Sequence, residues 1–161
     1  MQIIQSESIR RLDEEIAAIS AAVSALIAED DHLSRSLTLL LSIPGIGEQS
    51  AAILLAEVPD FRAFGHNKKI TAFAGLSPQE HISGRSVRGK TRISKAGNPR
   101  LRAAMYMCAL SARRSNPTLT AFGHRLKEAG KPPKVVLIAV ARKLLVIAYG
   151  VMKTQRAFIP A

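Results

Sequence analysis

Residues 41–58 read LSIPGIGEQSAAILLAEV, and this stretch decides the fold class. An apolar helix end meets Pro44-Gly45-Ile46-Gly47, and a second apolar helix opens at Ala51. The two glycines permit a tight turn, because glycine adopts backbone conformations that other residues avoid. The stretch therefore predicts two helices joined by a short corner.

The rest of the chain also reads as helices. Apolar spacing predicts them over residues 70–74, 99–114, 118–129 and 134–152. In the second of these, the side chains available for the core are Leu101, Ala104, Met105, Cys108 and Leu110. No run alternates as a long strand would, although residues 82–93 can pair briefly as a hairpin. The sequence thus predicts an all-α fold.

An apolar heptad occupies the first forty residues. Its members are Ile9, Leu12, Ile16, Ile19, Val23 and Leu26, and the register resumes at Leu33, Leu37 and Leu40. A narrow seam of this period is typical of a coiled coil, and Asp30 interrupts it, which predicts a break there. We predict a coiled-coil or helical-hairpin segment over residues 1–38 and a compact helical domain over 39–155. The alternative is an amphipathic helix packed on its own domain.

Composition narrows the class of partner. The 161 residues carry a net charge of +11 and a pI near 10.5, yet 47% are hydrophobic, so the chain can bury a core and favours polyanionic partners. Aromatic residues make up only 4%, which counts against a base-stacking sheet. Arg142 and Lys143 interrupt the apolar run 135–147, and no signal peptide follows Met1. We therefore expect no membrane partner and a cytoplasmic location.

The most basic stretch is residues 80–102, EHISGRSVRGKTRISKAGNPRLR, called the basic segment below. Its seven cations are Arg85, Arg88, Lys90, Arg92, Lys95, Arg100 and Arg102, and its serines are Ser83, Ser86 and Ser94. No carboxylate lies between Glu80 and Glu128. Clustered cations without neutralising acids indicate a polyphosphate partner.

The corner at 44–47 resembles the helix-hairpin-helix motif of nucleic-acid-binding proteins. Backbone N–H groups of Gly45 and Gly47, at a helix N-terminus, can face a phosphate. The alternative is a plain corner that touches no ligand.

Few residues have the pattern of a catalytic or metal site. Glu57, Asp60 and the acids near the N-terminus lack partners at helical spacing, so we expect no metal site. A serine is a poor nucleophile without help, and clustered cations can stabilise the charge of a phosphoryl transition state. His81 lies two residues before Ser83 and can serve as its general base. The residues alone do not choose between this chemistry and simple phosphate binding.

Three motifs occur in order: IPGIG at 43–47, FAGLSPQEHISG at 73–84 and RISKAGNPRLRAAMY at 92–106. Together they resemble the C-terminal domain of the IS-110/IS-116/IS-902 insertion-sequence transposases, a family that includes relatives of the Piv invertase. The resemblance covers roughly residues 39–148. The heptad before it is similar to the coiled coil that precedes this domain in the family.

The resemblance implies a DNA recombinase that acts as a homo-oligomer, with a structured guide RNA as a further partner. It implies a serine nucleophile at Ser83, with Ser94 as second choice and Ser86 as third. On the corner, the clustered charge and the resemblance together, the residues that we expect on DNA or RNA phosphates are Gly45, Gly47, Arg85, Arg88, Lys90, Arg92, Lys95, Arg100 and Arg102. The family's RuvC-like half, which holds Mg²⁺, is absent from this sequence. We therefore expect no cofactor here and no complete recombination by this chain alone.

Two other functions stay open at this point. One is a non-catalytic helix-hairpin-helix module that binds duplex DNA. The other is an RNA-binding assembly domain whose main purpose is its coiled coil.

Overall fold

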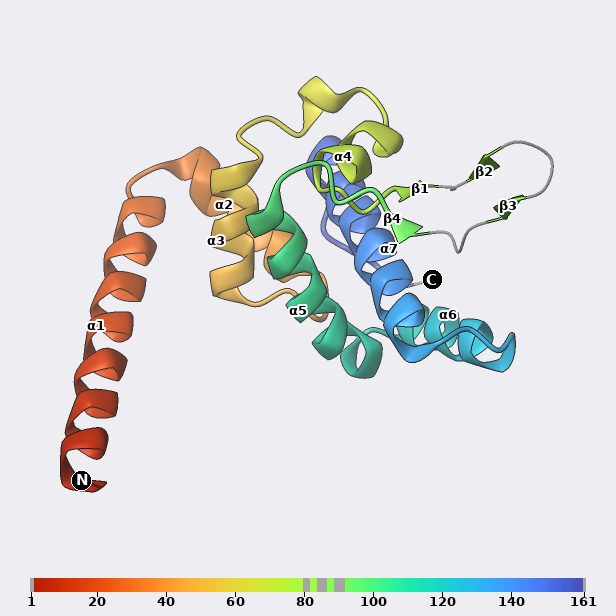
Figure 1. The fold of residues 1–161 in the computed structure, drawn as a ribbon. Helices are drawn as coiled ribbons and strands as arrows, with labels where there is room; N and C mark the ends of the chain where they lie inside the picture. Colours follow the sequence, from red (N-terminus) through yellow and green to blue (C-terminus); the bar gives the residue numbers. More distant parts are fainter. Residues whose placement is uncertain (1, 80–81, 84–86, 89–91, 161) are drawn as a thin grey trace.

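The computed structural model describes residues 2–79, 82–83, 87–88 and 92–160. Within them the chain is mainly helical, which confirms the all-α class (Figure 1). The helices are α1 (Gln2–Ala28), α2 (Asp31–Leu41), α3 (Glu48–Glu57), α4 (Asn67–Phe73), α5 (Pro99–Ser115), α6 (Pro117–Glu128) and α7 (Pro133–Thr154), with one 3₁₀ turn, η1 (Arg62–Phe64).

Two short antiparallel ladders interrupt the helices. β1 (Pro78–Gln79) pairs with β4 (Arg92–Ile93), and β2 (Ile82–Ser83) pairs with β3 (Val87–Arg88). The brief hairpin predicted over residues 82–93 is therefore confirmed, and the second ladder lies beyond the first (Figure 1).

Helix α7 is the centre of the domain, and α2, α4, α5 and α6 pack around it. By length and composition it is apolar enough to cross a membrane, but 56% of its most apolar window is buried inside the domain. Val140, Leu144 and Leu145 are fully buried. The helix therefore has the burial pattern of a core helix.

The core face of α5 matches the prediction at four positions and misses at one. Leu101, Ala104, Met105 and Cys108 are buried, whereas Leu110 is 43% exposed. Leu110 comes nine residues after Leu101, which at 3.6 residues per turn places it about 180° away on the helix. Burial raises the pKa of the Cys108 thiol, against an opposing hydrogen bond with Ser50, so this cysteine is not an activated nucleophile.

The corner between α2 and α3 confirms the turn predicted at 44–47. Gly45 has φ +103°, in the region that favours glycine, and it lies against α5. A Cβ on Gly45 would lie 2.4 Å from Cβ of Ala112. The buried Asn116 side chain donates to the Pro44 carbonyl at 3.4 Å. Gly45 is thus required where a backbone turn packs directly on a helix.

Helix α1 projects away from the rest of the molecule (Figure 1). The break predicted at Asp30 is confirmed, because its carboxylate caps α2 by accepting from the N–H groups of His32 and Leu33 at 2.8 and 3.0 Å. The six seam residues from Ile9 to Leu26 are 38–65% exposed. The alternative in which this helix packs on its own domain is therefore wrong for α1.

The α2 part of the heptad behaves differently. Leu40 is fully buried and Leu37 is partly buried against the core, where α2 packs on α3 and α7. The predicted boundary between residues 38 and 39 falls inside this helix.

Candidate nucleic-acid interface

Residues 73–79 pair with residues 92–98 of the basic segment, and together they form a compact support, called the loop base below. Besides the β1–β4 ladder, three backbone hydrogen bonds connect its two strands of chain. They run from Ser94 N to Ser77 O (3.0 Å), from Lys95 N to Gly75 O (3.3 Å) and from Asn98 N to Phe73 O (2.7 Å). Two of the three sequence motifs, separated along the chain, are thus side by side in the fold.

Glycines make this close approach possible. Gly97 has φ +149°, and a Cβ there would lie 2.4 Å from the Phe73 oxygen and 2.7 Å from the Gly75 nitrogen. Gly75 has φ +67°, and a Cβ there would meet backbone atoms of Lys95 at 3.1 Å. At Gly75 the Arg102 Nη1 is nearer still, at 2.5 Å. The loop base is therefore packed backbone against backbone, with no room for a side chain at either glycine.

The Arg102 side chain ties the loop base to α5. Its Nη1 donates to the carbonyl oxygens of Ala74 and Lys95, each at 3.2 Å. A guanidinium has five N–H donors, so these two bonds leave others for a ligand. Arg102, predicted to bind phosphate, therefore also has a structural role.

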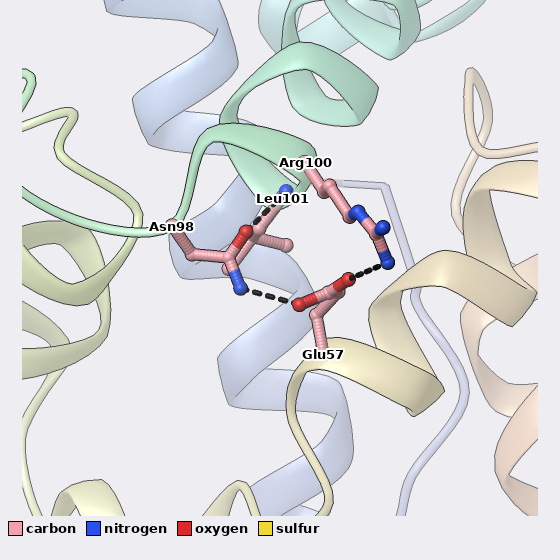
Figure 2. Close-up of polar contacts among 4 residues, drawn as sticks. All are labelled: Glu57, Asn98, Arg100 and Leu101. Atoms are coloured by element: carbon pink, nitrogen blue, oxygen red, sulfur yellow. Dashed lines mark hydrogen bonds and ion pairs between the residues drawn. The ribbon is translucent and has the colours of Figure 1, made fainter.

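A second polar anchor joins α3 to the start of α5 (Figure 2). The Asn98 side chain caps α5 by accepting from the Leu101 N–H at 3.0 Å, and its Nδ2 donates to the Glu57 carboxylate. Arg100 Nη1 lies 3.6 Å from the other Glu57 oxygen. Glu57 is therefore an anchor for the loop base.

Nothing in the described part of the chain resembles a metal site. Asp60 accepts from the Arg62 N–H at 2.7 Å, away from the contacts of Glu57. The described residues contain no group of three or more His, Cys, Asp or Glu side chains that could hold an ion. They do not fit the Mg²⁺ that the resemblance implies for the family's other half, and no step below uses it.

The anchor predicts unequal effects for two neighbouring substitutions. Asn98→Ala removes the cap of α5 and the donor to half-buried Glu57, so we expect the free energy of unfolding to fall by about 1–2 kcal/mol. Arg100 is 84% exposed, and an exposed ion pair contributes little. Arg100→Gln should therefore change stability by less than about 0.5 kcal/mol. Urea unfolding of both variants measures this, and equal losses would contradict the assignment.

The predicted serines and cations lie in three kinds of place: on the short strands, in the loop base, or outside the described residues. Ser83 lies on β2, where its backbone pairs with Val87, and Arg88 and Arg92 lie on β3 and β4. Ser94 and Lys95 follow β4 within the loop base, and Lys95 has φ +54°. The predicted residues outside the described residues are His81, Arg85, Ser86 and Lys90.

The corner at Gly45 and Gly47 lies apart from the loop base. It packs on Ala112, 13 residues after Pro99 at the start of α5, which corresponds to roughly 20 Å along the helix. Gly47 is exposed and has open space around it, but Glu48 adds a carboxylate to the first turn of α3. The two glycines predicted to contact phosphate are thus separate from the described cations Arg92 and Lys95 of the loop base.

The sequence motifs did not predict a further basic feature. A groove of about 970 Å³, called the basic groove below, runs between the loop base, α5, α6 and α7. Its cations are Lys95, Lys131, Lys134, Arg142 and Lys143. A signal for it was present in the sequence, since 17 of the 23 Lys and Arg residues but only one of the 12 Asp and Glu residues follow Glu80. Arg142 and Lys143 had been interpreted only as interruptions of an apolar run.

A helical domain that anchors a basic segment beside a basic groove has the charge that is typical of polyanion-binding modules. The chain belongs, more specifically, to the transposase IS116/IS110/IS902 family, which matches residues 37–124. This confirms the resemblance inferred from the three motifs.

Curated relatives match almost the whole chain. It is 33% identical over 153 residues to the pilin gene-inverting protein of Moraxella bovis, covering 94% of this chain and 48% of that protein. It is 29% identical over 148 residues to the insertion element IS110 uncharacterized 43.6 kDa protein of Streptomyces coelicolor, covering 92% of this chain and 35% of that protein. The chain thus spans about half, or less, of the length of these relatives.

Proposed function

We propose that this chain binds DNA during transposition or site-specific recombination and supplies a serine nucleophile, Ser83, for strand cleavage and joining. The observation that carries the proposal is the loop base, which brings two of the three family motifs together and joins residues 92–98 of the basic segment to residues 73–79. Family membership supports the DNA substrate, because relatives are named as transposases and as a gene-inverting protein.

Charge is the first part of the argument. Strands β2 and β3 of the basic segment lie beyond the loop base (Figure 1), where Arg102 and Lys95 are already positioned and Arg100 is exposed. Long-range attraction between such cations and phosphates supplies most of the affinity of sequence-independent DNA binding. A guide RNA offers the same phosphate chemistry and is proposed as a second polyanionic partner.

The proposed chemistry is a phosphoryl transfer. The Ser83 hydroxyl oxygen attacks a DNA phosphorus, the bond from that phosphorus to the departing strand oxygen breaks, and the serine proton passes to a base, for which His81 is the candidate. Charge that builds on the non-bridging oxygens is stabilised by the neighbouring cations. Ser94 is the second candidate, although its N–H is engaged with Ser77 and it suits a turn.

Salt dependence tests the binding. Labelled duplex DNA and a structured RNA are titrated with the chain over a salt series, and log affinity should fall with log salt by about 0.9 per phosphate engaged on duplex DNA. Neutralising Arg88, Arg92 and Lys95 to Gln should flatten the slope, while Arg10→Gln, Arg11→Gln and Arg35→Gln, an equal charge change on α1 and α2, should leave it nearly unchanged. Equal flattening by both triple variants would remove the basic segment from the interface.

A covalent trap tests the nucleophile. End-labelled nicked DNA is incubated with the chain and resolved on a denaturing gel. We expect a protein–DNA adduct with the wild type and with Ser86→Ala, and none with Ser83→Ala. An adduct that survives Ser83→Ala would falsify the assignment, and its loss in Ser94→Ala would move the role to that residue.

We also propose that α1 assembles copies of the chain, since its seam is exposed and has the coiled-coil period. Ile16→Asp places a charge in the seam, so we expect it to weaken self-association by about tenfold to a hundredfold. Ala21→Asp, on the outer face of the same helix, should have little effect. Sedimentation equilibrium over a concentration series measures both, and a wild type that stays monomeric at all concentrations would contradict the proposal.

A further inference from the structure

The basic groove is lined by both cations and apolar side chains. A phosphate backbone binds the cations and has no use for the apolar side chains. Its floor is apolar and includes Ile93, Ile138 and Val146, with Val135 on α7 still 48% exposed. Two aromatic side chains, Tyr106 and Phe122, also line the groove. Phosphates gain nothing from apolar and aromatic side chains, whereas the flat face of an unpaired base can pack on both. The groove therefore fits a ligand that is both anionic and apolar.

Among the residues that the structure describes, the cations of the groove have no acidic partners. No described carboxylate lines the groove, and none of its five cations forms an ion pair with another described residue. Arg142 and Lys143 are half-buried, and Lys143 Nζ lies 4.5 Å from the centre of the Phe122 ring. Five like charges in one groove repel one another, and a polyanion relieves that repulsion.

We propose that the basic groove holds a short stretch of single-stranded DNA, with its phosphates on the five cations and its unpaired bases on the apolar floor. A duplex keeps its bases stacked inside and presents mainly phosphates, so it leaves such a floor unused. Ile93 and Lys95 belong to both the loop base and the groove wall, so a strand opened at the basic segment lies next to the groove. The inference rests on the proposed DNA-binding function and adds the form of DNA bound.

Abasic DNA distinguishes binding by the cations of the groove from binding by its apolar lining. A labelled 12-nucleotide strand and an abasic strand of equal length carry the same phosphates, so a purely electrostatic contact binds both equally. Stacking of a base on an aromatic side chain is worth about five- to a hundredfold in single-strand sites. Because Tyr106 and Phe122 line the groove, we expect the abasic strand to bind at least about tenfold more weakly. Fluorescence anisotropy at fixed salt measures both affinities.

Variants locate the contact. Lys134→Gln combined with Arg142→Gln should weaken single-strand binding by about tenfold and flatten its salt slope by about 1.4, at about 0.7 per phosphate. Arg114→Gln with Arg156→Gln removes the same charge from exposed positions outside the groove and should have less than about a twofold effect. Val135→Glu places a carboxylate on an exposed part of the floor and should also lower single-strand affinity, with circular dichroism confirming the fold.

Three results would overturn the inference. The first is equal binding of the normal and abasic strands. The second is equal weakening by the groove variant and its control. The third is stronger binding of an RNA of the same sequence, or of a peptide with the acidic, amphipathic sequence of residues 6–30, which would assign the groove to another occupant. If one of these results is obtained while duplex DNA still binds with a salt slope set by Arg88, Arg92 and Lys95, the groove inference fails and the proposed function stands. If neither single-stranded nor duplex DNA binds, both fail.

Discussion

Gly97→Ala is expected to lower the free energy of unfolding by about 3–5 kcal/mol. Gly97 has φ +149°, a conformation that side-chain-bearing residues rarely adopt, and its added Cβ would lie 2.4 Å from the Phe73 carbonyl oxygen and 2.8 Å from that of Ala72. These neighbours are backbone atoms at the end of α4, so no side chain can rotate away. Relief requires the two halves of the loop base to separate.

Gly130→Ala is the matched control. Gly130 also has positive φ, at +72°, but nothing lies within 4 Å of the added Cβ. It should therefore show only the backbone cost of about 1–2 kcal/mol. Urea unfolding of both variants gives the difference, which measures the contact across the loop base. A Gly97→Ala variant no less stable than Gly130→Ala would mean that the loop base is not closely packed.

Gly45→Ala should lower stability by a similar amount, about 3–5 kcal/mol, at the other end of α5. Gly45 has φ +103°, and the new Cβ would lie 2.4 Å from Cβ and 2.5 Å from Cα of Ala112. Ala112 is itself fully buried in the core helix α5. The corner between α2 and α3 must therefore move away from α5, which would also separate the Pro44 carbonyl from Asn116.

Gly47→Ala, two residues away, separates packing from ligand binding. Gly47 caps α3 with φ −97°, and its surroundings are open, so alanine there should cost less than about 1 kcal/mol. Thermal unfolding followed by circular dichroism compares the two variants. Comparable losses at both positions would show that the corner does not pack on α5 as described.

The structure gives two residues that were singled out in the sequence, Gly45 and Glu57, physical roles that the sequence did not predict. Gly45 was predicted as part of a phosphate-binding corner, and its tight contact with Ala112 gives it a packing role as well. Glu57 was considered only as a weak metal candidate, yet it anchors the capped start of α5. Neither role could be predicted, because each depends on a residue more than 40 positions away in the chain.

Sequence by itself determined the all-α class, the break at Asp30, the exposed-seam period of α1 and the family. These features depend on local signals: apolar spacing, capping side chains, glycine and proline turns, and three motifs in order. Tertiary structure alone decided that residues 73–79 and 92–98 form one support and that Lys95 joins cations from α7 and the α6–α7 link in a groove. The physical reason is that packing α5, α6 and α7 around a shared core brings together charges far apart in the chain, and a linear pattern does not contain those distances.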